Sequence, residues 1–311
     1  MQIWTYARKI PPRQLQELMI RLPFSATKPR YMPGFFLWWP ILLLVLALAY
    51  WPGLWGGFYF DDMVHIVLNP FAHPARFDWI SFSSAVNSSN SGPTGRPLAM
   101  LSFAFDYLWH GSNPAAMKAI NVAIHAFNGF LLYRLLLRLL PPLWPGEPRK
   151  LAWLCAALWL LHPLQVSSVL YIVQRMTLLS ATLMLLGLIG YVRERQKQRL
   201  ATAWLYLALA TAIGMLAKEN ALLTPVYAFL IEVGILRFAG LRKPSRDWIK
   251  KLYYALPWIF IFFALLYWAF HPDWFARTYA SRPFDVITRL LTEARAVAFY
   301  QWLIVAPNVS R

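Results

Sequence analysis

Long, uninterrupted apolar runs recur along the chain, and they restrict its fold more than any other feature. A hydrocarbon core about 30 Å thick takes about 20 helical residues to cross. Continuous runs favour helices over a barrel, whose strands would alternate polar and apolar residues. The sequence therefore predicts an all-α, polytopic membrane protein with about eight spans. We expect these at residues 35–52, 117–140, 151–163, 176–192, 200–217, 221–237, 252–270 and 294–307.

The distribution of charge along the chain predicts its orientation. The formal net charge of +17 comes from 30 Lys and Arg residues against 13 Asp and Glu. With the N-terminus inside, 21 of the 30 basic residues fall on inner segments and eight of the 13 acids on outer ones. An excess of Lys and Arg marks the cytoplasmic side of membrane proteins. We therefore expect a cytoplasmic N-terminus, and the basic composition does not require a nucleic-acid partner.

Two parts of the chain differ in composition. Residues 1–34 are basic and polar, and we expect a cytoplasmic arm, part of which either lies on the membrane surface or is solvated. Residues 35–311 form the expected transmembrane domain. Within this domain, residues 53–116 make the largest outer segment, which is longer than a simple connector requires. This segment is expected either to cover a cavity between the spans or to act as a structural loop.

The outer segment 53–116 carries two distinct features. It begins with "GGFYFDDMVHIVLNP", in which Asp61 and Asp62 are adjacent although the chain has few acids. It ends with an apolar repeat at helical spacing, which predicts an amphipathic helix at the membrane interface. The residues of this repeat are Leu98, Leu101, Phe105 and Leu108.

Several stretches of the chain resemble one family, the transmembrane and TPR-repeat O-mannosyltransferases. "FDDMVHIVLNP" and "GRPLAMLSFAFDYLWHGSNPAAMKAINVAIHAFNGFLLY" resemble the family's first luminal loop and second span. "LHPLQVSSVLYIVQRMTLLSATLMLLGLIGY" is similar to its third and fourth spans, and "AKENALLTPVYAFLIE" resembles its Lys-Glu motif. "RLLTEARAVAFYQWLIVAPN" resembles the segment that enters a later span. The resemblance covers roughly residues 50–311, in order.

The resemblance implies a GT-C-like helical bundle that works as an inverting glycosyltransferase. Such enzymes transfer a sugar from a polyprenyl-phosphate carrier on the outer face of the membrane, using carboxylates in the first outer loop. The implied partners are membrane lipid and a protein or glycolipid acceptor, and we expect a bacterial inner membrane with a periplasmic active face. Family members usually continue with further spans and often a TPR region. Because this chain stops at Arg311, we expect a truncated form or one with a C-terminal partner.

The resemblance also assigns roles to the two carboxylates. A carboxylate within hydrogen-bond reach of an acceptor hydroxyl serves as a general base. Asp61 is the leading candidate for this base, with Asp62 as its orienting partner. No cofactor is certain, but the pair would suit Mg or Mn, which prefer hard oxygen ligands. The alternative is that both carboxylates cap a short helix or face water.

Cations near the outer ends of the spans suit the phosphate of the carrier. Arg96, Arg175 and Lys218 are the candidates, because guanidinium and ammonium groups bind phosphate oxygens. The alternative is that the cations reach the interface by snorkelling, with Lys218 paired to the supporting residue Glu219.

Two further polar residues are candidates for supporting roles. His162, just before Pro163, either binds sugar or phosphate, orients Asp61, or ends a broken helix. Asn69 is expected to hold the outer loop in shape.

Two other functions remain open on the sequence alone. The first is a transporter or lipid-linked-sugar flippase, and the second is a non-catalytic partial subunit. Transporters place ionisable groups near the membrane midplane and use broken helices and repeats. The polar groups of this chain collect on one side of the spans instead, which favours an enzyme at the interface.

Overall fold

A computed structural model describes residues 38–89, 94–141, 147–238, 241, 243–271, 279, 282 and 284–307. Every regular element within these ranges is a helix, as the apolar runs predict. The expected basic arm, residues 1–34, lies outside the described part of the chain. The chain separates into two compact units, residues 1–240 and 241–311.

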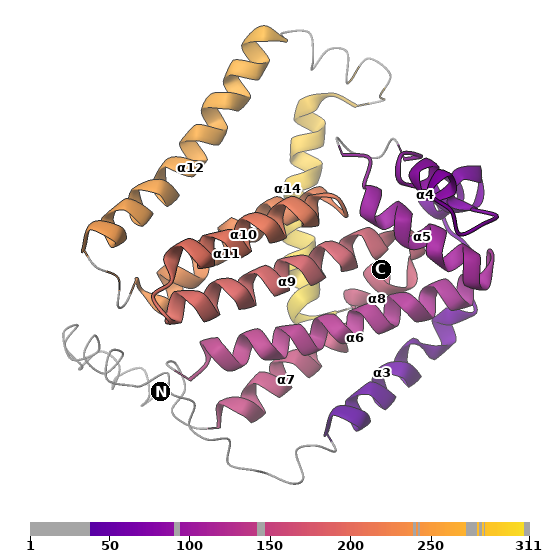
Figure 1. Cartoon of the computed structure of the whole chain (residues 1–311), viewed down its shortest axis with the longest axis horizontal. Coiled ribbons are helices and arrows are strands. Elements are labelled where there is room, and N and C mark those ends of the chain that lie inside the picture. The colour runs from indigo at the N-terminus through magenta and orange to yellow at the C-terminus, as the bar shows by residue number, and fades with distance from the viewer. Residues whose placement is uncertain are drawn as a thin grey trace. The chain divides into compact units, whose positions relative to one another are not determined.

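The first unit is organised around one long helix, α6 (Pro114–Leu139). Its first turn is capped by Asn113, whose side-chain oxygen accepts hydrogen bonds from the next two free amides, at 3.0 and 3.2 Å. α6 packs against α3 (Trp38–Leu54), α7 (Pro148–Leu160) and α9 (Arg175–Gln196) (Figure 1). The same unit also contains α8 (Gln165–Leu170), η4 (Ile172–Gln174), α10 (Leu200–Met215), η5 (Glu219–Leu223), α11 (Thr224–Ile231) and η6 (Glu232–Leu236).

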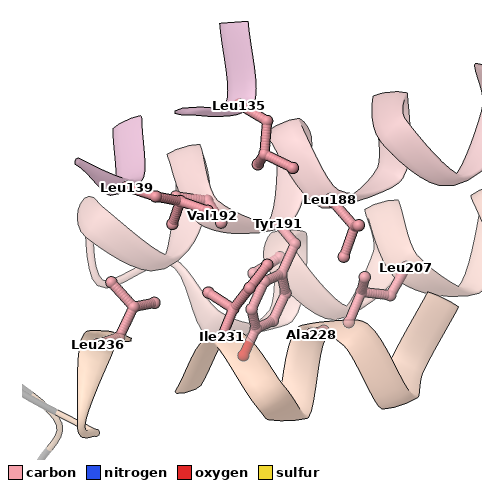
Figure 2. Close-up of a cluster of buried hydrophobic side chains, with 10 residues drawn as sticks. Leu135, Leu139, Leu188, Tyr191, Val192, Leu207, Ala228, Ile231 and Leu236 are labelled. Atoms are coloured by element: carbon pink, nitrogen blue, oxygen red, sulfur yellow. The ribbon is translucent and has the colours of Figure 1, made fainter. Parts of the chain in front are cut away.

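One of the apolar clusters of this unit lies between α6, α9, α10 and α11. Side chains from all four helices and from η6 point toward Tyr191 of α9, as Figure 2 shows. Glycines let the helices approach closely at this point. A Cβ at Gly187 would lie 2.3 Å from the Cβ of Ala210, and one at Gly190 would lie 2.4 Å from the ring of Tyr206. Small residues at such contacts are typical of helix packing in membranes.

The outer loop folds into η2 (Met63–Val67), η3 (Pro70–Ala72), α4 (Trp79–Val86) and α5 (Pro97–His110). The amphipathic helix predicted near the end of the loop is therefore present as α5. Its fully buried side is not the predicted stripe, whose four residues are only half-buried. The buried side consists of Ala99, Met100, Phe103, Ala104 and Asp106.

The apolar lengths of the helices agree with a membrane protein. Among the described residues, three helical stretches are long and apolar enough to cross a membrane, Pro114–Leu139, Ile172–Gln196 and Glu219–Leu236, and α3 and α10 are shorter apolar helices. These five coincide with five predicted spans. The predicted span 151–163 is observed as α7, which has 13 residues and ends before His162 and Pro163. Proline disfavours the helical conformation in the residue before it, and this explains why α7 ends early.

The described part of the second unit contains two long helices. α12 (Lys243–Phe270) has 28 residues, and α14 (Val286–Val305) has 20. Asp285 precedes α14 and caps it, because its carboxylate accepts the amide of Thr288 at 2.7 Å. Helices therefore cover most of the last two predicted spans, 252–270 and 294–307.

Candidate active site at the first outer loop

A seven-residue segment, 171–177, contains η4 and the first residues of α9, and it contacts most of the residues singled out in the sequence. It reads Tyr-Ile-Val-Gln-Arg-Met-Thr. Its members bond to the outer loop at one end and to the turn between α10 and η5 at the other. The predicted site residues come from segments more than 100 residues apart, and this segment brings many of them into one connected network.

Asp62 fastens the outer loop to this segment. Its Oδ1 accepts the amide of Val173 at 2.7 Å, and its Oδ2 accepts the amide of Tyr59 at 3.1 Å. Its side chain is fully buried. Burial raises the pKa of the Asp62 carboxyl above its ordinary value, whereas these amides and the nearby Lys118 ammonium counteract that rise. Asp62 thus positions the loop and presents no oxygen to solvent.

Asp61 differs from its neighbour because its side chain is exposed. The backbone turns sharply just before the two aspartates, because Phe60 has a left-handed φ of +43°. Such a conformation in a non-glycine residue costs on the order of 1–3 kcal/mol and is often retained at functional sites. The amide of Asp61 donates to the hydroxyl of Tyr171 at 2.8 Å. The carboxylate therefore lies at the surface beside a phenol.

Aromatic rings surround Asp61. Tyr59 and Phe60 are in edge contact, with centroids 4.2 Å apart, and both rings are more than 60% exposed. The ring of Tyr171 lies 6.2 Å from that of Tyr59. Burial raises the pKa of the Tyr171 hydroxyl, and the negative charges of Asp61 and Asp62 add to this effect. Tyr171 consequently keeps its proton at neutral pH and remains a hydrogen-bond donor.

Lys118 of α6 fixes the beginning of the outer loop, a few residues before Asp61. Its ammonium donates to the carbonyl oxygens of Gly53 and Gly56, at 3.2 and 2.7 Å. A side chain at Gly56 would place its Cβ 2.9 Å from this nitrogen, so the lysine would have to shift to make room for it. Lys118 and Asp62 together hold the segment that presents Asp61.

Arg175 is buried in the centre of the network. Its Nη1 lies 2.5 Å from Oδ2 of Asp106 on α5, and its Nε donates to the side chain of Asn121 at 2.8 Å. Its Nη2 donates to the carbonyl of Met117 at 2.9 Å, and its guanidinium lies 4.9 Å from the centroid of the Phe103 ring. Arg175 is only 1% exposed, and its donors are directed at protein groups. Its role is therefore to hold the helices in position. We therefore do not propose it as a ligand for the donor phosphate.

Arg96 and Glu219 form a two-point ion pair at the edge of the site. Arg96 Nε and Nη2 donate to the two carboxylate oxygens of Glu219, at 3.3 and 3.1 Å. Arg96 has a left-handed φ of +53° and precedes the first turn of α5. A backbone hydrogen bond also holds the loop here, from the amide of Leu98 to the carbonyl of Leu216 at 2.9 Å. Both charged side chains remain partly exposed.

Lys218 lies next to this ion pair. Its ammonium donates to the hydroxyl of Thr177 at 2.8 Å and to the side-chain oxygen of Gln174 at 3.2 Å. Burial lowers the pKa of Lys218 below its ordinary value, the positive charge of Arg96 lowers it further, and Glu219 opposes both. Two cations and one carboxylate leave this cluster with a net positive charge, which suits an anionic group.

Asn69 and His162 stabilise turns. Asn69 caps η3 by accepting the amide of Phe71 at 3.1 Å, and its amide group donates to the hydroxyl of Ser88 at 3.0 Å. His162 Nδ1 accepts the amide of Leu164 at 3.2 Å, in the turn between α7 and α8. Asn69 thus joins two parts of the outer loop, and His162 shapes a turn on another segment.

The donor set around Asp61 does not fit a metal shared by the two carboxylates. Asp62 is fully buried, and both of its oxygens accept backbone amides. In the described part of the chain, no three His, Cys, Asp or Glu side chains gather closely enough to hold a metal ion. Divalent cations such as Mg²⁺ need several oxygen ligands, so we derive no catalytic step through a metal.

The comparisons with known proteins agree with the predicted family resemblance. The chain is 24% identical to protein O-mannosyl-transferase TMTC3 of Mus musculus over 188 residues, which cover 58% of this chain and 20% of the relative. It is 32% identical to TMTC1 of Mus musculus over 154 residues (48% and 16%). It is 30% identical to TMTC4 of Homo sapiens over 186 residues (53% and 25%). No family profile matches the chain, and no solved structure matches it.

Helices that are long and apolar enough to cross a membrane indicate an integral membrane protein. Within that class, the chain is a distant homologue of one part of the protein O-mannosyl-transferases. The matches span a quarter or less of each of these three relatives.

Sequence reasoning missed several residues that build the site. Lys118, Asn121 and Tyr171 lie in stretches that resemble the family, but nothing in their spacing marks them. Asp106 did carry a signal, because it is a lone charge on a helix and shares a face with Phe103 three residues earlier. A charge on the buried side of such a helix predicts a buried partner, which the structure identifies as Arg175.

Proposed function

We propose that this chain is a membrane glycosyltransferase of GT-C-like architecture with about eight spans. It moves a sugar from a polyprenyl-phosphate donor to a protein or glycolipid acceptor on the outer face of the membrane. The distant homology to protein O-mannosyl-transferases supports this class of reaction. The observation that carries the proposal is that one segment, 171–177, contacts both the exposed carboxylate region and the cationic cluster.

The geometry of that segment suits a displacement reaction. Tyr171 contacts the backbone of Asp61, and Gln174 contacts the ammonium of Lys218. These two residues are three positions apart, and a 3₁₀ turn rises about 2 Å per residue, so their backbones are separated by about 6 Å. The proposed base and the proposed phosphate-binding cluster therefore both contact one short turn.

In the proposed reaction, the Asp61 carboxylate takes the proton of the acceptor hydroxyl. The acceptor oxygen then forms a bond to the anomeric carbon, while the bond from that carbon to the phosphate oxygen breaks. Polyprenyl phosphate leaves with the bonding electrons, and Lys218 and Arg96 stabilise its negative charge. A single displacement of this kind inverts the anomeric configuration. General-base catalysis contributes about 10²- to 10⁴-fold to such a reaction.

The other residues of the network act on these groups indirectly. Asp62 and Lys118 hold the loop that presents Asp61, and Arg175 fixes α5, which begins next to Arg96. Glu219 holds the Arg96 guanidinium through two bonds. These are positioning residues, because each acts through another side chain or through the backbone.

The reaction is tested by incubating membranes that contain the full chain with radiolabelled polyprenyl-phosphate sugars. We expect one donor of the panel to label protein or glycolipid, and we expect the label to be lost in Asp61→Asn. Asp78→Asn is the matched control, since Asp78 is an exposed acid of the same loop that caps α4 at a distance from the network. Asparagine also caps helices well, so this control should transfer sugar at the parent rate.

Two outcomes would overturn the proposal. Movement of labelled donor across the membrane without transfer would indicate a flippase. Transfer by folded Asp61→Asn protein at the parent rate would remove Asp61 from the chemistry.

A further inference from the structure

A second site lies on the first unit, between α3 and α6. Here a groove of about 810 Å³ opens along the two helices. Its volume is in the range of small-molecule binding sites, about 300–1,000 Å³. Its lining is aromatic and aliphatic except at one end. The main lining residues are Trp39, Leu43, Phe127, Phe130, Tyr133 and Arg134.

This groove is separate from the candidate active site. The active-site network uses the beginning of α6, at Met117, Lys118 and Asn121. The groove uses residues 126–134 of the same helix. A helix rises 1.5 Å per residue, so Lys118 and Phe130 are about 18 Å apart along its axis.

The polar end of the groove is positively charged. The Arg134 guanidinium lies 5.8 Å from the centroid of the Phe130 ring. Arg134 makes no ion pair with a carboxylate among the residues that the structure describes. Arg149 of α7 acts electrostatically on the Tyr133 hydroxyl together with Arg134, and Arg138 follows one turn later on α6. Arg134 thus lines one end of an apolar groove, and the charges of Arg138 and Arg149 act on Arg134 and on its neighbour Tyr133.

The charge distribution of the sequence places this end on the cytoplasmic side. Arg134, Arg138 and Arg149 belong to one of the inner segments whose basic residues determine the N-in orientation. Anionic phospholipids of the cytoplasmic leaflet are attracted to basic groups there, and basic pockets between transmembrane helices bind their head groups.

We propose that this groove binds an anionic phospholipid of the cytoplasmic leaflet. An acyl chain lies along Trp39, Leu43 and Phe130, and the phosphate lies at Arg134. The apolar lining and the single cationic end match an amphiphile with a negative head group. A zwitterionic lipid would offer the same acyl chains but no net charge to the arginines. This inference rests on the orientation and on the groove, and it does not depend on sugar transfer.

The proposal is tested by native mass spectrometry of the full chain released from detergent. Phosphatidylglycerol and phosphatidylcholine with identical acyl chains are the probes. We expect phosphatidylglycerol to bind at least several-fold more tightly to the parent protein. Arg134→Gln should reduce phosphatidylglycerol binding to the phosphatidylcholine level. Arg199→Gln is the matched control, since this side chain is 67% exposed on an inner turn and lies outside the groove.

A second variant tests the apolar part of the site. Leu43→Trp should fill the groove and weaken binding of both lipids, and because Leu43 is exposed, the variant should fold normally. Equal binding of the two lipids to the parent, or unchanged phosphatidylglycerol binding in Arg134→Gln, would overturn the proposal. Tighter binding of a polyprenyl phosphate than of phosphatidylglycerol to the parent, lost in Leu43→Trp, would also overturn it, since the carrier would then be the occupant.

Discussion

The Arg175 guanidinium and the Asp106 carboxylate are 2.5 Å apart, and both side chains are buried. This ion pair joins α9, which belongs to a candidate span, to α5, which belongs to the outer loop. A buried charge is costly unless it is paired and its remaining donors are satisfied. Asn121 and the carbonyl of Met117 accept two of these donors. The pair therefore fixes the position of the outer loop over the helices.

We predict that Asp106→Asn destabilises the protein by about 3–5 kcal/mol, because it leaves a buried guanidinium without its counter-charge. Thermal unfolding in detergent, followed by circular dichroism, measures the change. The double variant Asp106→Leu with Arg175→Met is the control, since it removes both charges and should be closer to the parent in stability. Unchanged stability in Asp106→Asn, together with weaker donor binding in Arg175→Ala, would instead indicate that Arg175 binds the phosphate.

Substitutions of the two adjacent aspartates are predicted to have different effects, on turnover at Asp61 and on stability at Asp62. Asp61→Asn should fold normally but lose about 10²-fold or more in turnover, because an amide cannot act as the base. Asp62→Asn should lose stability by about 1–3 kcal/mol, since its NH₂ group would face a backbone amide that needs an acceptor. Unfolding midpoints and single-turnover rates of both variants separate these effects. A stable Asp62→Asn protein with a large loss of turnover would place Asp62 in the chemistry.

The helices were largely predictable from the sequence, because their apolar length is a local property. The expected span 117–140 corresponds to α6 at Pro114–Leu139, and the amphipathic repeat at the end of the outer loop is α5. The start of α6 was missed by three residues. Asn113 and Pro114 are a capping signal that hydropathy alone does not reveal.

The arrangement of the candidate site was much less predictable. Asp61 and Asp62 are identical side chains in adjacent positions, and only the left-handed turn at Phe60 and the distant amide of Val173 give them different environments. Bonds between residues more than 100 positions apart leave no periodic trace in the sequence. Lys218 and Arg175 were both predicted as site residues because they lie near the ends of predicted spans. This position does not reveal burial, and the structure shows that Lys218 is half-buried whereas Arg175 is fully buried.

The orientation is predicted to be N-in, with the outer loop and the turn after α9 on opposite sides. In a Cys155→Ala background, Ser112→Cys and Lys197→Cys introduce thiols at exposed positions. A membrane-impermeant maleimide should label Ser112→Cys from the outer side of intact cells. It should label Lys197→Cys only after the membrane is opened. The reverse pattern would place Asp61 in the cytoplasm and remove the proposed active face.

The last prediction concerns the pH dependence of donor use. Burial, followed by the charge of Arg96, lowers the pKa of Lys218 from its ordinary value of 10.5. Only the protonated ammonium attracts the donor phosphate, so kcat/KM for the donor should be highest below the pKa of Lys218 in the folded protein. It should fall as pH rises through that pKa, which lies below 10.5.

Lys218→Arg should retain its charge across this range, because guanidinium loses its proton only above about pH 12. We therefore expect the alkaline fall to be absent or shifted upward in Lys218→Arg, even if the variant is slower at neutral pH. The measurement is a pH profile of kcat/KM for both proteins, with unfolding followed in parallel. Identical alkaline falls in two folded proteins would show that Lys218 does not carry the charge that holds the phosphate.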